Sequence, residues 1–180
     1  MKFIRTAVEG AYIVELEPHG DDRGFFARAY SVTEFAEQGI DFTVRNANTT
    51  HTAARGTLRG LHYQLPPAAE DKFIRCTRGA VYSVLVDMRP GSPTRLQHVG
   101  VELSRENRRA LVIPGLCAAG ALTLTDDAET FYLVSADYSP DLERGIRFDD
   151  PALAIDWPIP VTAVSDKDRS WRDIDSEEMT

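Results

Sequence analysis

The amino-acid sequence predicts an all-β protein, a sandwich or barrel of many short strands with a few short helices. Short β-favouring runs recur along residues 42–135, and polar turns such as 104–107 separate them. Glycine and proline mark further connections, as at residues 89–93 (RPGSP). Before the C-terminal region, a convincing helix signal occurs only at residues 31–38.

The bulk properties limit the class of protein. The chain has 180 residues, of which 43% are hydrophobic and 27% charged, and we expect one domain over residues 1–180. A net charge of -8 argues against a nucleic-acid partner, which needs a basic face. The two distant cysteines, Cys76 and Cys117, offer neither a disulfide framework nor zinc spacing and fit the cytoplasm. Neither a signal-peptide core nor a membrane-spanning apolar run occurs, so we expect no membrane partner.

The elements before residue 42 are short. We predict strands at residues 3–4, 11–16 and 25–30. Residues 18–24 are dense in turn-forming residues and are predicted to be a turn. The helix at 31–38 begins with a capping box, Ser31 to Glu34, and ends at Gly39.

Strands dominate from residue 42 onward. Polar residues alternate at 46, 48, 50 and 52, so on a strand they share one face. The other predicted strands are 56–64, 72–78, 80–88, 97–103, 109–113, 117–125 and 129–135. Residues 138–180 are predicted to be a less regular tail.

Residues 56–64 (GTLRGLHYQ) place a histidine, an arginine and two glycines inside a predicted strand. Glycine within a strand weakens packing and often marks a bulge or a close approach of a ligand. His62 is therefore either a hydrogen-bonded core histidine on a bent strand or part of a binding site.

A β-barrel with an internal histidine suggests a metal-binding cupin, which gathers two or three histidines and a carboxylate around one ion. Here His62 precedes Tyr63 and Gln64, and the late strand begins LCAAG at 116–120, without a ligand. The remaining histidines lie in turns or polar stretches: His19, His51 and His98. We expect no catalytic metal.

Acid–base chemistry without a metal needs other groups. The candidates are His62, Lys72, Tyr132 and the carboxylate of Asp168. Taken singly, each also suits an ordinary structural role, as a core histidine, a strand-end lysine, a core aromatic or a turn residue.

Several motifs in order settle the choice. They are residues 21–26 (DDRGFF), 56–64, 72–79 (KFIRCTRG), 86–94 (VDMRPGSPT), 101–109 (VELSRENRR), 143–151 (ERGIRFDDP) and 165–168 (SDKD). With them the sequence resembles the nucleotide-sugar 3,5-epimerases typified by dTDP-4-dehydrorhamnose 3,5-epimerase. The resemblance implies a metal-free, cofactor-independent cupin-type jelly roll, and a homodimer that exchanges N-terminal strands.

The resemblance also implies the chemistry. The substrate is a 4-keto-6-deoxy sugar on a nucleoside diphosphate, whose ketone acidifies the neighbouring C–H bonds. His62 is the implied base, which Asp168 orients. Lys72 stabilises the enolate oxygen, and Tyr132 is the acid on the far face of the sugar.

The implied substrate-binding residues lie in several motifs. Arg23 and Arg59 hold the diphosphate, because forked planar donors suit phosphate oxygens. The resemblance also implies that Asn48 contacts the nucleotide and that Phe26 and Tyr138 stack on its base, although Phe26 suits ordinary core packing nearly as well.

Arg59 and His62 raise a question of geometry. On a regular strand they have opposite parity and face opposite sides. Either Gly60 carries a bulge that turns both inward, or Arg59 serves a pocket on the partner subunit. We expect the second arrangement, although the two are nearly balanced.

Two positions depart from the family pattern. Relatives commonly carry a histidine where this chain has Ala119 and an aspartate where it has Ser83, and those two groups pair beside the sugar. Small residues at Cys117 and Ala121 also remove bulk, so this substrate-binding wall is predicted to be wider and less polar.

Three functions follow. The chain epimerises a 4-keto nucleotide sugar, at one carbon or both, or it applies the same groups to another carbonyl substrate of secondary metabolism. The third alternative is a non-catalytic binding module, which the retention of all four acid–base groups disfavours.

Overall fold

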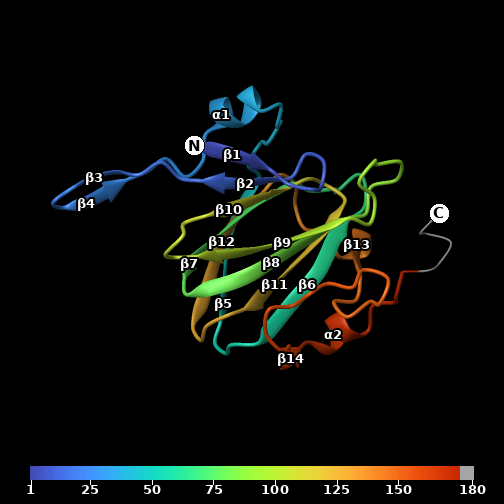
Figure 1. Cartoon of the computed structure of the whole chain (residues 1–180). Helices are drawn as coiled ribbons and strands as arrows, with labels where there is room; N and C mark the ends of the chain where they lie inside the picture. Colours follow the sequence, from blue (N-terminus) through green and yellow to red (C-terminus); the bar gives the residue numbers. More distant parts are fainter. Residues whose placement is uncertain (175–180) are drawn as a thin grey trace.

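The computed structural model describes residues 1–174 and shows two β-sheets packed face to face (Figure 1). The first sheet has the order β1 (Lys2–Arg5), β2 (Tyr12–Glu15), β10 (Ala110–Ile113), β7 (Lys72–Arg78), β12 (Ala128–Val134) and β5 (Asn46–Thr52). The second has the order β13 (Glu143–Gly145), β6 (Thr57–Gln64), β11 (Cys117–Thr123), β8 (Ala80–Asp87) and β9 (His98–Ser104). The all-β prediction is confirmed.

The remaining elements surround this sandwich. Strand β14 (Ala163–Val164) pairs in parallel with β6, and helix α2 (Asp166–Arg169) follows it. Strands β3 (His19–Asp21) and β4 (Gly24–Phe26) form a hairpin that projects from the body as an arm (Figure 1). A 3₁₀ turn at Pro140–Leu142 leads into β13. Among residues 1–174, no helix is long and apolar enough to cross a membrane.

Alternation along the strands directs polar side chains into the space between the sheets. On β5, Asn48, Thr50 and Thr52 are at least partly buried, whereas the residues between them are exposed. The predicted polar face is therefore confirmed for these three residues, which turn toward the interior, whereas Asn46 at the start of the strand is exposed.

Three predictions for local structure needed correction. The turn expected at 18–24 contains strand β3, which pairs with β4. The strand expected at 25–30 ends at Phe26, and residues 27–30 lead irregularly into the helix. The tail is more ordered than predicted, because β13, β14 and α2 all pack against β6. These pairings are long-range, so local sequence patterns do not reveal them.

Helix α1 (Val32–Glu37) confirms the predicted helix. Of the two hydrogen bonds of the predicted capping box, one forms. The Ser31 hydroxyl accepts from the Glu34 amide at 3.4 Å. The Glu34 carboxylate does not return the bond. It accepts from the terminal amino group of Met1 at 2.6 Å instead.

We expect Phe35→Ala to lower the free energy of unfolding by about 3–5 kcal/mol, the usual cost of truncating a buried phenylalanine. Phe35 is fully buried, and its ring lies 5.3 Å from Phe73 and 4.9 Å from Tyr30. Urea denaturation measures the loss. Val32→Ala is the matched control, because Val32 is 64% exposed on the same helix. A similar small effect in both variants would contradict the packing account.

Candidate functional site

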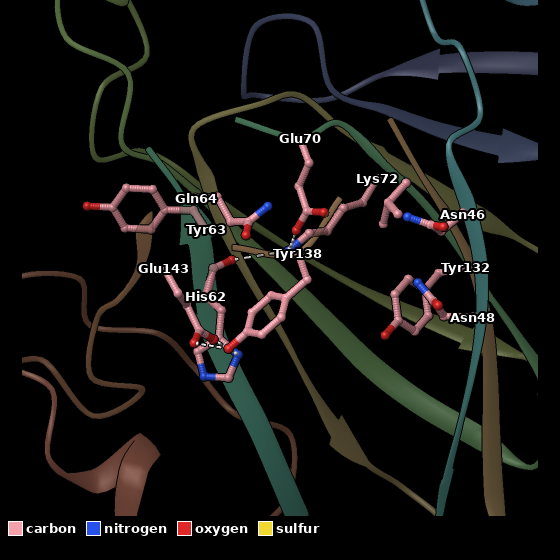
Figure 2. A pocket seen from close by; sticks show the side chains of 11 residues that line it. Asn46, Asn48, His62, Tyr63, Gln64, Glu70, Lys72, Tyr132, Tyr138 and Glu143 are labelled. Atoms are coloured by element: carbon pink, nitrogen blue, oxygen red, sulfur yellow. Dashed lines mark hydrogen bonds and ion pairs between the residues drawn. The ribbon is translucent and has the colours of Figure 1, made fainter. Parts of the chain in front are cut away.

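A cavity of about 320 Å³ lies between the two sheets and contains five of the predicted site residues. They are Asn48, His62, Lys72, Tyr132 and Tyr138. Figure 2 places His62 and Tyr138 at one side of the cavity and Tyr132 with Asn48 at the opposite side. Residues from β5, β6, β7 and β12 thus converge on a single space.

His62 and Asp168 form a hydrogen-bonded pair. The His62 Nε2 lies 2.5 Å from Asp168 Oδ1, and the Asp168 carboxylate is nearly buried. The Ser165 hydroxyl caps α2 by accepting from the Asp168 amide at 3.1 Å, which holds the first turn of the helix that carries this carboxylate. An ionised carboxylate only accepts, so the ring donates from Nε2 and its Nδ1 lone pair is free to act as a base.

A second carboxylate, that of Glu143, approaches the other ring nitrogen. Glu143 Oε1 lies 3.8 Å from His62 Nδ1, and Figure 2 shows the two side chains next to each other. Its Oε2 accepts from the Tyr138 hydroxyl at 2.7 Å and from Lys167 Nζ at 2.5 Å. Burial opposes ionisation of Glu143, but the bonds from Lys167 and Tyr138 outweigh it and hold its pKa below the usual range. The same bond to Glu143 raises the pKa of Tyr138.

The Lys72 side chain lines the cavity and forms an ion pair with a neighbouring carboxylate. Its Nζ lies 3.0 Å from Glu70 Oε1, and both side chains are less than one-fifth exposed. Nζ also lies 3.5 Å from the His62 carbonyl oxygen. This places a positive charge beside the histidine, where an anion formed on a ligand would be stabilised.

A bulge at Gly60 explains how Arg59 and His62 share a site. Ala119 pairs with His62 and Ala121 with Arg59, so two residues of β6 oppose one of β11 between those pairs. Gly60 has φ +120°, and a Cβ there would lie 2.7 Å from the Ala119 carbonyl oxygen. Both side chains line the same recess of their own chain. The geometry therefore favours the bulge over the expected partner-subunit arrangement.

An apolar recess of about 160 Å³ opens beside His62 and Tyr132. Its floor includes Ser83, Ala119 and Ala121, which carry small side chains. Ser83 is almost fully buried, and its hydroxyl lies 3.5 Å from the Gly120 carbonyl oxygen, to which it donates. Of the residues predicted to form a wider wall, Ser83, Ala119 and Ala121 line this hollow, whereas Cys117 is buried in the hydrophobic core and does not line it.

Two predicted residues lie elsewhere. Arg23 and Phe26 are on the projecting β3–β4 arm, and they line a surface hollow with His19. The Arg23 side chain is 89% exposed and pairs with Asp21. Within one chain, the structure does not bring Arg23 or Phe26 to the His62 cavity.

Sequence analysis missed three charged groups of this site. Glu143 and Lys167 lie in the motifs 143–151 and 165–168, and Glu70 lies in the loop before β7. The motifs were the available signal, but position along the chain does not show that Glu143 approaches a histidine. In residues 1–174, no three His, Cys, Asp or Glu side chains are grouped so as to hold a metal ion.

Comparison with known proteins gives consistent matches. Residues 5–176 match the family described as dTDP-4-dehydrorhamnose 3,5-epimerase. The Sinorhizobium fredii protein of that name is 40% identical over 94% of this chain and 88% of its own. A dTDP-4-dehydrorhamnose 3-epimerase of Streptomyces niveus is 36% identical over 94% of this chain and 82% of its own.

A solved structure extends the match to the fold. The Bacillus anthracis dTDP-4-dehydrorhamnose 3,5-epimerase, with TDP and PPi bound, superposes with a TM-score of 0.92. It is 38% identical and covers 96% of this chain and 99% of its own. The predicted cupin-type jelly roll is confirmed.

Proposed function

This chain belongs to the dTDP-4-dehydrorhamnose 3,5-epimerase family, and on that premise we propose that it epimerises a 4-keto-6-deoxy sugar carried on a nucleoside diphosphate, with dTDP as the first candidate. The observation that carries the proposal is the opposition of His62, paired with Asp168, to Tyr132 across one cavity. Inverting a carbon needs a base on one face and an acid on the other.

The proposed reaction proceeds through an enolate. His62 Nδ1 takes the proton from a carbon next to the ketone, and the C–H electron pair moves to the ketone oxygen. Lys72 stabilises the negative charge that develops there. The Tyr132 hydroxyl then gives its proton to the opposite face of the carbon, and proton exchange with water restores both residues.

Asp168 supports the base in this scheme. Its carboxylate fixes the tautomer of His62 and stabilises the imidazolium that forms. No cofactor is part of the proposed scheme, because the ketone of the substrate itself stabilises the carbanion.

Nucleotide binding is assigned to the rim of the site. Arg59, Asn48 and Tyr138 line the cavity or its recess and suit the diphosphate and the base. Arg23 and Phe26 project on the arm, and we propose that in a homodimer this arm completes the site of the partner subunit. The chain acts as a single domain in this proposal.

The recess bears on the choice of substrate. Its small lining residues Ser83, Ala119 and Ala121 leave room for a sugar larger than the parent 4-keto-6-deoxyhexose. This favours, as the second candidate, proton transfer on a different carbonyl substrate that fills the recess. The Streptomyces niveus relative, a 3-epimerase by name, supports the first candidate in a one-carbon form.

Deuterium wash-in tests the proposal. The chain is incubated in heavy water with dTDP-4-keto-6-deoxyglucose, and C3 and C5 are followed separately by NMR. We expect deuterium at C3, and its presence or absence at C5 separates a 3,5-epimerase from a one-carbon enzyme. A folded protein that exchanges neither carbon, with this sugar on several nucleotides, would contradict the first candidate.

A further inference from the structure

His62 lies between two carboxylates, of which the family chemistry above uses one. Asp168 binds Nε2, and Glu143 Oε1 lies 3.8 Å from Nδ1, the nitrogen that faces the cavity (Figure 2). Building on the proposed function, we propose that Glu143 is a positioning residue for the base. It favours the imidazolium that proton abstraction creates, and Lys167 limits the size of that effect.

Glu143 is not itself the base. Its Oε2 accepts from both Tyr138 and Lys167, and these bonds keep the carboxylate ionised although it is only 10% exposed. Its pKa is held below the usual range, so it is a poor acceptor for a carbon-bound proton. Its influence on the reaction is therefore electrostatic and passes through His62.

The interaction changes sign during the reaction. When His62 is neutral, its Nδ1 carries a lone pair 3.8 Å from the nearer Glu143 oxygen, and no hydrogen lies between the two acceptors. Once Nδ1 carries the proton, the same pair is a cation facing an anion at close range and largely out of water. An interaction that strengthens as the imidazolium forms lowers the barrier to proton abstraction.

Helix α2 supplies one positive and one negative side chain to the groups around His62. Its neighbouring residues Lys167 and Asp168 bind different members of the site, Lys167 binding Glu143 and Asp168 binding His62. With neutral His62, these four groups carry one excess negative charge, which the imidazolium cancels. Removing Glu143 or Lys167 must therefore act on His62 in opposite directions.

The other charged or titratable groups around His62 are unchanged by these variants. Those that line its cavities or bind it are Asp168, Tyr132, Lys72, Arg59, Glu70, Tyr63 and Tyr138. Only Glu143 and Lys167 are altered. If the titration midpoint of His62 shifts in opposite directions in the two variants, the shifts can be assigned to the Glu143–Lys167 pair.

The test follows the titration of His62 by ¹³C NMR in the full-length chain. Glu143→Gln is expected to lower the midpoint, because it removes an anion near Nδ1. Lys167→Gln is expected to raise the midpoint, because it removes the positive charge that offsets the Glu143 carboxylate. Asp141→Asn is the matched control, an exposed carboxylate two residues away that lines none of these cavities, and it should leave the midpoint unchanged.

A kinetic arm uses the wash-in reaction. Glu143→Gln should lower the rate at saturating substrate about tenfold and move the acid limb of the kcat/KM profile to lower pH. Midpoints that move in the same direction in both variants, or that do not move, would overturn the proposal. Lys167 is half-exposed, so its variant carries the test even if Glu143→Gln fails to fold.

The two arms separate this inference from the proposed function. If the wild-type chain shows no wash-in, the proposed function fails, and the opposite NMR shifts still decide the role of Glu143 toward His62. If wash-in occurs but the midpoints do not diverge, only the positioning role fails.

Discussion

Replacing His62 by asparagine is expected to reduce deuterium wash-in and epimerisation together, by about 10²–10⁴-fold. Asparagine fills much of the same space but cannot take a proton from carbon. Because abstraction precedes every later step, exchange and inversion must fall in parallel. Wash-in followed by NMR, with product analysis on the same samples, measures both losses.

His51→Asn is the matched control for this result. His51 lies on β5, half-exposed, with its Nε2 3.3 Å from Asp127 Oδ1, and it lines none of the cavities around His62. We expect it to retain wild-type rates. Undiminished wash-in by His62→Asn would assign the base to another group of the cavity.

Tyr132→Phe is expected to separate exchange from inversion. The ring remains in the cavity but loses its hydroxyl, so the enolate still forms at His62 and is quenched mainly from the face it left. Inversion should fall about 10²-fold or more, whereas wash-in at the abstracted position should fall far less. The ratio of inverted product to incorporated deuterium is the measurement.

Tyr82→Phe controls for the loss of a tyrosine hydroxyl elsewhere in the fold. Tyr82 packs against Trp157 and does not line the cavities that contain His62. Its ratio of inversion to exchange should match the wild type. An equal loss of exchange and inversion in Tyr132→Phe would remove Tyr132 from the role of acid.

Local sequence patterns were sufficient for much of the fold. Turn residues and two-residue alternation are properties of short segments, so most strand positions between residues 42 and 135 agree with prediction. The helix after Ser31 followed from its cap, another local signal. The tail was predicted least well, because β13 and β14 exist only through pairing with β6.

The functional site likewise has some features that the sequence predicts and others that depend on long-range contacts. The sequence alone determined the acid–base candidates, because His62, Lys72 and Asp168 stand in ordered motifs of the chain and Tyr132 is a reactive residue type on a predicted strand.

Only the tertiary structure decided how these groups act on one another. It brought Asp168 to His62 across 106 positions of sequence and set Glu143 against the other ring nitrogen. The bulge that turns Arg59 inward depends on the register between β6 and β11. Register and long-range contact arise from the packing of whole sheets, and no short stretch of sequence contains that information.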